Sequence, residues 1–409
     1  MRARFGLIGR RLPHSYSPRI HQLLADYPYD LWELEPENVP AFMRGKDFDA
    51  CNVTIPYKET VIPFLDVLDA TAIEIGSVNT VVKGPDGRLT GYNTDGFGFR
   101  YMLESAGIDP AGKKVAILGS GGTSKTAKYV CSKMGARETV VVSRAGAVSY
   151  GDTDRYADAE ILINCTPVGM YPNNLAVPVD IDRFSELLGF ADVIYNPNRT
   201  LLTMEAEQRG IPAVTGLSML VAQAKKAAEF FTGEAIPDPA IDRVTRQIFF
   251  ENSNIVLIGM PGSGKTTVGS ALAERLGRRF VDTDEELRET LGTAAGDYIN
   301  LYGEAAFREQ ETKIMERFGK EKQLVIATGG GLVTVPKALY AARQNAVVVF
   351  LNRPLDQLAT EGRPLSAKKG VEALWQERGA LYKKGCDLEI DAGGTAVDCV
   401  DAILKAVCV

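Results

Sequence analysis

The stretch GMPGSGKTT, residues 259–267, follows the apolar run NIVLI and decides the fold of the second half of the chain. A glycine-rich turn between a strand and a helix surrounds the phosphates of a nucleotide with backbone N–H groups. In this pattern we expect Lys265 to neutralise the β and γ phosphates and Thr266 to bind Mg²⁺. The other loop residues expected at the nucleotide are Gly259, Gly262, Ser263, Gly264 and Thr267. A glycine turn that only caps a helix is the simpler alternative.

The composition is that of an ordinary globular protein. The chain has 409 residues, of which 45% are hydrophobic and 24% are charged, and its net charge is -6. This length predicts two or three domains, and the acidic balance gives no broad positive field for nucleic acid or membrane lipid. The six cysteines form no CxxC pair, and no run of 18 apolar residues occurs. We therefore expect a cytoplasmic enzyme that acts on small metabolites, without a zinc site or a disulfide framework.

Short apolar runs alternate with helix-like segments along the whole chain. This alternation predicts an α/β fold whose parallel sheets are covered by helices on both faces. The strand candidates are residues 50–55, 114–119, 138–143, 160–165, 191–196, 254–259, 323–328 and 346–352. The clearest domain boundary lies in 232–254, where two prolines precede a helical pattern and the polar string ENSN precedes a strand.

The string FVDTD, residues 280–284, ends an apolar run with two carboxylates. On a strand, Asp282 and Asp284 would lie on the same face, with Asp282 near the metal and Asp284 near a hydroxylated acceptor. Arg308 and Arg378 carry forked donors that suit a carboxylate. Taken singly, each arginine is more simply explained as a solvated surface charge.

Five strings occur in order between residues 254 and 409: GMPGSGKTTVG, FVDTD, GEAAFREQE, ATGGG and GRPL. Together they resemble shikimate kinase. The resemblance implies ATP as phosphate donor, Mg²⁺, and shikimate as acceptor. It places the following residues around the acceptor: Asp284, Arg308, Gly329, Gly330, Gly331 and Arg378. Arg363 resembles the lid arginine over the transferred phosphate, although the stretch from Arg363 to Arg378 is shorter than the family's lid.

The string KVAILGSGGTSKT, residues 114–126, predicts a strand, a glycine turn and a helix. This order approximates the fingerprint of dinucleotide-binding folds, with the coenzyme expected at Gly119, Ser120, Gly121 and Gly122. The next strand ends in Ser143 and Arg144, where an NAD enzyme would carry a carboxylate. An arginine at this position favours the 2'-phosphate of NADP, and a solvated arginine is the alternative.

The opening segments carry a different set of polar side chains. Ser15 and Ser17 are two residues apart, so in an extended loop both hydroxyls face one way and can bind a carboxylate without a cation. Reduction of a ketone requires a proton for its oxygen, and a buried lysine beside an aspartate is a suitable acid and base pair. Lys58 and Asp95 are the expected pair. Individually, Lys58 is equally explained as a surface lysine and Asp95 as a helix cap.

The strings HSYSPRIH, NVTIPYK, GSVNT, GYNTDGFG, GSGG, NCTPVGM, IYNPNRTLL and GLSMLVAQA occur in order before residue 250. They are similar to shikimate dehydrogenase. The resemblance implies that eight residues hold the substrate: Ser15, Ser17, Thr54, Lys58, Asn79, Asp95, Tyr195 and Gln223. It also implies that the helix after Gln223 packs back on the first domain. The segment 143–160 is shorter than the family's crossover, so we expect no regular helix there.

The two resemblances imply a discontinuous α/β substrate domain over 1–98 and 217–250, a Rossmann-like NADP domain over 99–216, and a P-loop kinase domain over 254–409. The implied reactions are consecutive, because NADPH reduces 3-dehydroshikimate to shikimate, which ATP then phosphorylates. One alternative is a metabolite sensor derived from such enzymes, which should have lost its catalytic side chains. Another is a quinate or shikimate dehydrogenase that prefers NAD, fused to the kinase.

Overall fold

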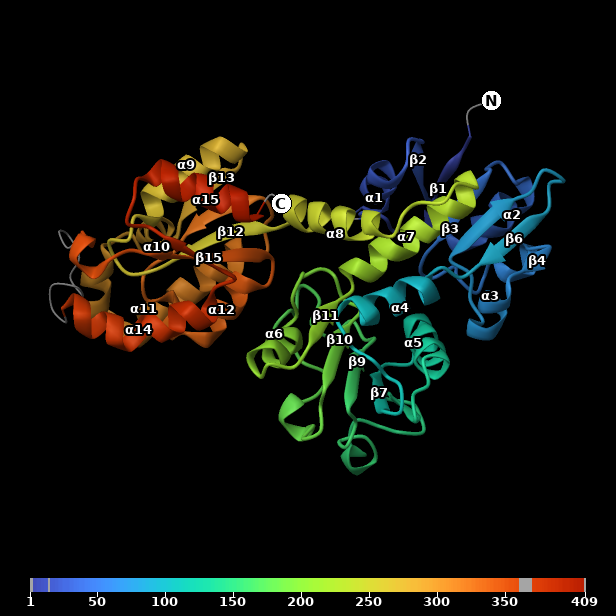
Figure 1. The fold of residues 1–409 in the computed structure, drawn as a ribbon, viewed down its shortest axis with the longest axis horizontal. Coiled ribbons are helices and arrows are strands. Elements are labelled where there is room, and N and C mark those ends of the chain that lie inside the picture. Colours follow the sequence, from blue (N-terminus) through green and yellow to red (C-terminus); the bar gives the residue numbers. More distant parts are fainter. Residues whose placement is uncertain (1–2, 14, 360–369, 408–409) are drawn as a thin grey trace. The chain divides into compact units, whose positions relative to one another are not determined.

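The computed structural model describes residues 3–13, 15–359 and 370–407. Three separate sheets can be followed in Figure 1. The chain divides into two compact units, Met1–Asn196 with Thr200–Ile248, and Pro197–Arg199 with Phe249–Val409. The first unit contains two of the sheets, and the second unit contains the third.

The first sheet is built from residues 5–92. Its elements are β1 (Phe5–Gly9), α1 (Ser17–Leu24), β2 (Tyr29–Glu33), α2 (Val39–Gly45), β3 (Ala50–Val53), β4 (Val67–Leu68), α3 (Ala70–Ile75), β5 (Thr80–Lys83) and β6 (Leu89–Tyr92). The strand order is β2-β1-β3-β5-β6-β4, and β5 pairs antiparallel with both β3 and β6. The prediction of parallel sheets throughout is therefore wrong here. The connection from β5 to β6 is a short hairpin, which can join only antiparallel neighbours.

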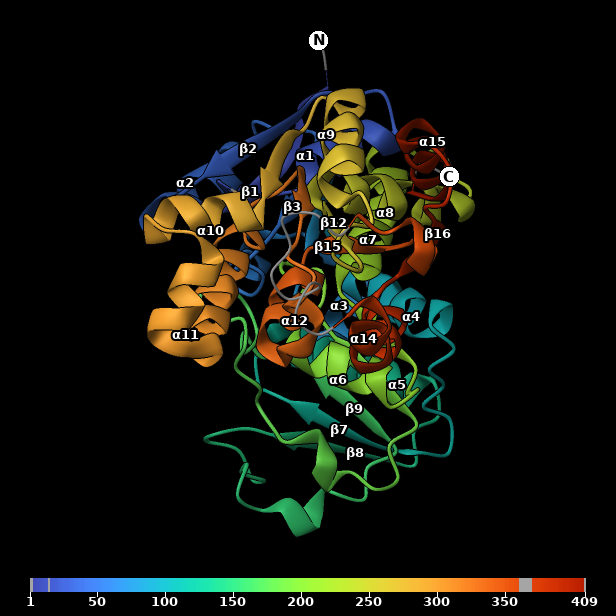
Figure 2. The ribbon, with the colours of Figure 1, turned by 90° about the vertical axis from the view of Figure 1, so that its left-hand side faces the viewer.

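The second sheet lies in the same unit. Its elements are α4 (Asp95–Ser105), β7 (Lys114–Leu118), α5 (Gly122–Lys133), β8 (Glu138–Val142), β9 (Ile161–Asn164), β10 (Gly189–Asp192), α6 (Leu201–Gln208), β11 (Ala213–Thr215) and α7 (Leu217–Thr232). All five strands pair in parallel, in the order β11-β10-β9-β7-β8. Figure 2 shows β7, β8 and β9 side by side.

Strand β7 shows why this sheet is covered on both faces. Val115 and Ile117 pack with apolar residues of α4 and α5, whereas Ala116 and Leu118 pack with Leu202 and other residues on the opposite face. Alternate side chains of a strand point to opposite faces, so the continuous apolar run fills two cores. The predicted α/β class is confirmed.

Helix α7 packs against the first sheet. Its residues Ala227 and Phe231 share a core cluster with Phe5 of β1 and Ala50 of β3. Both residues follow Gln223 in α7, which confirms the expectation that the helix after Gln223 packs back on the first domain. The segment 143–160 holds only the short 3-10 helix Thr153–Arg155, so the absence of a regular helix there is also confirmed.

The third sheet belongs to the second unit. The elements from residue 239 onward are α8 (Pro239–Asn252), β12 (Asn254–Ile258), α9 (Lys265–Leu276), β13 (Arg279–Asp282), α10 (Thr283–Leu291), α11 (Ala295–Phe318), β14 (Leu324–Ala327), α12 (Pro336–Arg343), β15 (Ala346–Asn352), α14 (Val371–Gly385), β16 (Leu388–Asp391) and α15 (Ala396–Val407). The strands are parallel, in the order β13-β14-β12-β15-β16. Helices α9 and α15 cover one face, and α11, α12 and α14 cover the other (Figure 1).

Two strands end earlier than the sequence predicted, and each ends at an aspartate. The strand expected at 191–196 is β10, which ends at Asp192, where the side chain accepts a hydrogen bond from the backbone N–H of Ile194. Similarly, β13 ends at Asp282, which caps α10 by accepting from the backbone N–H of Asp284 at 3.0 Å. Aspartate favours turns and helix N-caps, because its carboxylate competes for nearby backbone donors.

Candidate active sites

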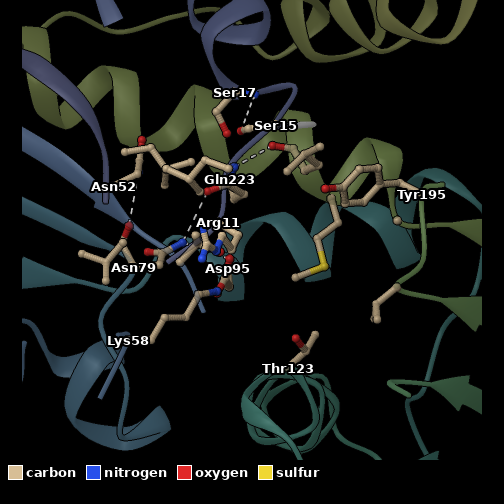
Figure 3. Close-up of a pocket in the computed structure, with 18 of the residues that line it drawn as sticks. Arg11, Ser15, Ser17, Asn52, Lys58, Asn79, Asp95, Thr123, Tyr195 and Gln223 are labelled. Atoms are coloured by element: carbon tan, nitrogen blue, oxygen red, sulfur yellow. Dashed lines mark hydrogen bonds and ion pairs between the residues drawn. The ribbon is translucent and has the colours of Figure 1, made fainter. Parts of the chain in front are cut away.

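A cavity of about 510 Å³ in the first unit is lined by residues of β1 and β3 in the first sheet, by residues that follow β10 and β11 of the second sheet, and by residues of α4 and α7. The eight side chains expected to hold a substrate all line it: Ser15, Ser17, Thr54, Lys58, Asn79, Asp95, Tyr195 and Gln223. Figure 3 shows how most of them converge on this space. Residues separated by more than 200 positions thus contribute to a single site.

Lys58 and Asp95 form an ion pair in this cavity. Lys58 Nζ donates to Asp95 Oδ2 over 2.5 Å, and the two side chains are only 24% and 11% exposed. Asp95 begins α4, where the helix N-terminus also favours a negative charge. Its other oxygen, Oδ1, accepts from Asn79 Nδ2 at 2.9 Å. The carboxylate is therefore fixed between an amide and the ammonium group of Lys58.

The hydrogen bonds of Asn79 determine which way its amide faces. Asn79 Oδ1 accepts from the backbone N–H of Thr94 at 2.8 Å and from Thr80 Oγ1 at 3.1 Å. Because the oxygen is used in this way, Nδ2 is directed to Asp95. Asn79, Thr80 and Thr94 are all buried, so this orientation is well supported by packing.

Ser15, Ser17, Tyr195 and Gln223 are further polar residues that line the cavity. The backbone N–H of Ser17 donates to Ser15 Oγ at 3.3 Å, which keeps the two hydroxyls in one turn. The ring of Tyr195 lies 5.4 Å from that of Tyr16. Burial raises the pKa of the Tyr195 phenol, so the group stays protonated and can donate a hydrogen bond. Gln223 Oε1 accepts from Asn79 Nδ2 at 3.4 Å.

The glycine turn after β7 leads directly into α5. Gly119 has φ +100°, and a Cβ there would lie 3.1 Å from the carbonyl oxygen of Cys165. A Cβ at Gly121 or Gly122 would meet nothing within 4 Å, so the turn is open above the start of α5. Thr123, the next residue, lines the same cavity as Lys58. Ser120 is exposed, as is Arg144, while the backbone N–H of buried Ser143 donates to the carbonyl of Val148 at 3.0 Å.

In the second unit, the loop between β12 and α9 is shaped by its glycines. Gly262 and Gly264 have φ +88° and +92°, which favour glycine, and α9 begins directly at Lys265. Lys265 Nζ is folded over the loop and donates to the carbonyls of Gly259 and Met260 at 3.0 Å each. Ser263 Oγ is buried and has no hydrogen-bond partner within the described residues.

A second polar cluster faces this loop. Thr266 Oγ1 donates to Asp282 Oδ2 at 2.8 Å, which places a hydroxyl and a carboxylate together beside the start of α9. Asp284 lies in the first turn of α10 and not on a strand, so the expectation of two carboxylates on one strand face is wrong. Its carboxylate nevertheless approaches Gly329, where a Cβ would lie 2.6 Å from Asp284 Oδ1.

The glycine triplet after β14 lies in close contact with the other predicted side chains. A Cβ at Gly330 would lie 2.8 Å from the ring of Pro261 in the phosphate loop, and one at Gly331 would overlap the guanidinium group of Arg308. Arg378 is 2% exposed and donates to the Gly330 carbonyl at 3.2 Å. The structure therefore brings Asp284, the triplet and both arginines together. Arg363 lies outside the described residues.

Comparison with known proteins assigns the first unit to a family. A shikimate dehydrogenase (NADP(+)) from Moorella thermoacetica is 33% identical over 289 residues, which cover 63% of this chain and 96% of the relative. The chain belongs to the shikimate dehydrogenase family. Residues 7–81 match the model of the shikimate dehydrogenase substrate binding domain. The cavity that contains Lys58 and Asp95 lies in this unit and is hereafter called the dehydrogenase cavity.

Solved structures support this assignment. A chorismate mutase/shikimate 5-dehydrogenase fusion protein from Clostridium acetobutylicum is 32% identical, with a TM-score of 0.57 and coverage of 61% of this chain and 97% of that one. A shikimate 5-dehydrogenase from Thermus thermophilus, in complex with NADP(H) and shikimate, is 28% identical, with a TM-score of 0.55 and coverage of 60% and 99%. Residues 261–408 match the model of shikimate kinase, so the second unit carries a shikimate kinase domain.

Several residues of both sites were missed in the sequence. The dehydrogenase cavity is also lined by Arg11, Asn52 and Thr123. Asn52 could have been predicted from the sequence, because it lies two residues before Thr54. In an extended segment, side chains two residues apart point to the same side. In the kinase domain, Glu311 and Tyr382 were missed.

Glu311 and Tyr382 each lie one helical turn beyond a predicted arginine. Glu311 is three residues after Arg308 and forms an ion pair with it, and Tyr382 is four residues after Arg378. Burial, with the nearby charge of Asp284, raises the pKa of Glu311. Tyr382 Oη donates to the Gly330 carbonyl at 2.5 Å. Both residues hold parts of the acceptor site in place.

Proposed function

We propose that this chain is a bifunctional enzyme that catalyses two consecutive reactions. The first is the NADPH-dependent reduction of 3-dehydroshikimate to shikimate, and the second is the ATP-dependent phosphorylation of shikimate to shikimate 3-phosphate. The observation that carries the proposal is the presence, on one chain, of a cavity lined by all eight expected substrate residues in a shikimate dehydrogenase unit, and of a phosphate loop in a shikimate kinase domain.

In the reduction, Lys58 supplies the proton. NADPH, when bound, would supply the hydride for the ketone carbon, and the negative charge that develops on the ketone oxygen would need a proton. Lys58 Nζ, bonded to Asp95 at 2.5 Å, then donates a proton to that oxygen. Asp95 keeps the ammonium group in place and stabilises its charge. Ser15, Ser17 and Tyr195 are assigned to the substrate carboxylate, and Thr54, Asn79 and Gln223 to the ring hydroxyls and their surroundings.

The coenzyme fits the open glycine turn. Gly119, Ser120, Gly121 and Gly122 precede α5, whose N-terminus favours an anion. Arg144, at the end of β8, is assigned to the 2'-phosphate with Ser143, since no acidic residue occupies that strand end. The preference for NADP over NAD follows from this arginine and is part of the proposal.

In the phosphorylation, Asp284 accepts the proton of the attacking hydroxyl. Its carboxylate lies beside Gly329, where the acceptor would contact the backbone. Arg308 and Arg378 would hold the carboxylate of shikimate, since fork-shaped donors pair with it in two places. Lys265 would leave the loop carbonyls and neutralise the transferred phosphate. Arg363 is assigned to the same phosphate from the family resemblance alone.

The phosphate loop fits ATP with Mg²⁺. Buried Ser263 Oγ has no partner in the described part of the chain, and Gly262 and Gly264 have positive φ angles, as in glycine-rich loops that bind anions. Thr266 and Asp282 would bind the metal, which neutralises phosphate charge during transfer. No group of three or more His, Cys, Asp or Glu residues within the described ranges could hold a metal by itself. Mg²⁺ at such sites takes most of its ligands from phosphate and water, so two protein ligands suffice.

The domain limits and location are part of the same proposal. We assign 1–98 and 217–250 to the substrate domain, 99–216 to the NADP domain, and 254–409 to the kinase. The limit at 98/99 falls within α4, which therefore runs from one domain into the other. No helix among the described residues is long and apolar enough to cross a bilayer, and we propose that the enzyme works in the cytoplasm.

The proposal is tested with the purified full chain in two separate assays. Oxidation of NADPH is followed with 3-dehydroshikimate, and formation of ADP is followed with shikimate, ATP and Mg²⁺. Both reactions should proceed, and each should stop when its own substrate is omitted. A sensor derived from these enzymes would bind the ligands without turnover, so binding without product in either assay would remove that half of the proposal.

A further inference from the structure

The dehydrogenase cavity contains a positive charge that the proposed reduction does not use. Three charged side chains line it among the described residues: Arg11, Lys58 and Asp95. Lys58 and Asp95 neutralise each other at 2.5 Å. Arg11 lies 3.8 Å from Glu35, and that carboxylate is already bonded to Arg10 at 3.0 Å. The described lining therefore keeps a net positive charge, which comes from Arg11.

The backbone of Arg11 is held in the same turn as the two substrate serines. The N–H of Leu12, the next residue, donates to Glu33 Oε1 at 2.7 Å. The N–H of Ser15 then donates to the Leu12 carbonyl at 3.1 Å, and the N–H of Ser17 donates to Ser15 Oγ. The Leu12 side chain is buried. Although the Arg11 side chain is 76% exposed, the backbone that follows it is held by these hydrogen bonds close to Ser15.

We propose that Arg11 is a specificity-determining residue of the dehydrogenase, whose guanidinium group binds the substrate carboxylate together with Ser15 and Ser17. Hydroxyl groups form hydrogen bonds with neutral and with charged ligands. A guanidinium group adds an electrostatic attraction that favours an anionic ligand. The coenzyme phosphates are the other anions near the cavity. Arg11 directly precedes the turn from Leu12 to Ser15 and lies far along the chain from the glycine turn after β7, so we assign the carboxylate as its partner.

This inference rests on the proposed reduction of 3-dehydroshikimate, and steady-state kinetics of Arg11→Gln test it. We expect the KM for the acid to rise about fivefold, because an exposed charge pair contributes at most about 1 kcal/mol. Turnover and the KM for NADPH should stay unchanged. The methyl ester of the substrate gives a second readout, since it lacks the negative charge. The preference for acid over ester in kcat/KM should fall about fivefold in the variant.

Arg10→Gln is the matched control. It removes the same charge from the same loop, and Arg10 also bonds to Glu35, but it does not line the cavity. The control should leave the KM and the acid preference unchanged, and Arg11→Lys should keep part of both. The inference is overturned if Arg11→Gln leaves the KM for the acid unchanged, raises the KM for NADPH instead, or behaves like Arg10→Gln. A wild-type protein that reduces nothing would overturn the proposed function and this inference together.

Discussion

Lys58 Nζ lies 2.5 Å from Asp95 Oδ2, although 37 positions separate the two residues in the chain. One follows β3 and the other begins α4, so the fold of the first unit is needed to bring them together. Replacing Lys58 by Ala removes the proton donor of the reduction. We predict a fall in kcat of at least about 10²-fold for 3-dehydroshikimate, measured by NADPH absorbance. The shikimate-dependent release of ADP by the same sample should be unchanged.

Changes at the phosphate loop should stop the kinase reaction and leave the reduction unchanged. Lys265→Ala removes the cation that lies over the phosphate loop, and chelation of divalent metal removes the Mg²⁺ that Thr266 and Asp282 are proposed to bind. Each treatment should abolish ADP release with shikimate, while NADPH oxidation continues at the rate of the untreated enzyme. If chelation also stopped the reduction, the two sites would not be independent.

The hydroxyl of Tyr382 should set the affinity of the kinase for its acceptor. It donates to the Gly330 carbonyl at 2.5 Å and is almost fully buried. In Tyr382→Phe the ring keeps its packing, but one donor to the glycine triplet is lost. A buried hydrogen bond contributes about 0.5–1.5 kcal/mol, so the KM for shikimate should rise about two- to tenfold. Tyr302→Phe, at an exposed position of the same unit, should have no effect.

Close packing of α4 on α7 should depend on Gly98. A Cβ at this position would lie 2.5 Å from the Met219 carbonyl, which belongs to the backbone and cannot turn away. We predict that Gly98→Ala lowers the free energy of unfolding by about 1–3 kcal/mol, seen as a lower melting temperature. Gly96→Ala in the same helix is the control, because its Cβ would have ordinary contacts at 3.5 Å. That variant should be neutral or stabilised, since alanine favours helix.

The buried carboxyl of Asp192 should make stability depend on pH. Desolvation raises its pKa from 3.8 to about 6, despite hydrogen bonds from Ile194, Thr200 and Asn164. Below about pH 4 the group is protonated in both states, and it destabilises neither. Between about pH 4 and 6 the unfolded chain loses the proton while the folded chain retains it, so stability falls as the pH rises. The full effect, about 3 kcal/mol, is present above about pH 6.

Asp192→Asn separates this effect from other titrations. The free energy of unfolding of the variant, minus that of the wild type, should increase by about 3 kcal/mol between about pH 4 and 7. Denaturant unfolding at a series of pH values measures it. A difference that stays constant with pH would mean that Asp192 does not titrate in this range.

Most of the fold could be predicted because its strands are continuous apolar runs. The strands at 114–118, 254–258 and 346–352 match their apolar strings closely, since strands covered on both faces need no polar side. The antiparallel part of the first sheet was not predicted. Its strands β5 and β6 are short and partly polar, and local sequence does not determine which strand pairs with which.

The candidate sites show the same division between local and tertiary information. The phosphate loop is a local feature, and its residues were read from one string. Among the eight expected substrate residues of the dehydrogenase, Ser15, Ser17, Lys58 and Asp95 were argued from their residue types, and the other four were named from the family resemblance alone. The structure brings all eight to one cavity. Arg11 and Tyr382 were missed because a lone arginine or tyrosine carries no signal until its neighbours in space are known. Asp282 and Asp284 lie close together, but the sequence analysis expected both on a strand. The structure instead begins α10 between them, at Thr283.

The central claim is that a single chain carries two independent sites that act on the same ring in succession. Incubation of the full chain with 3-dehydroshikimate, NADPH, ATP and Mg²⁺, followed by mass spectrometry of the products, tests it most directly. The account predicts shikimate 3-phosphate with equal amounts of NADP⁺ and ADP, only shikimate in Lys265→Ala, and neither product in Lys58→Ala unless shikimate is added. Failure of added shikimate to restore the phosphorylated product in Lys58→Ala would contradict it.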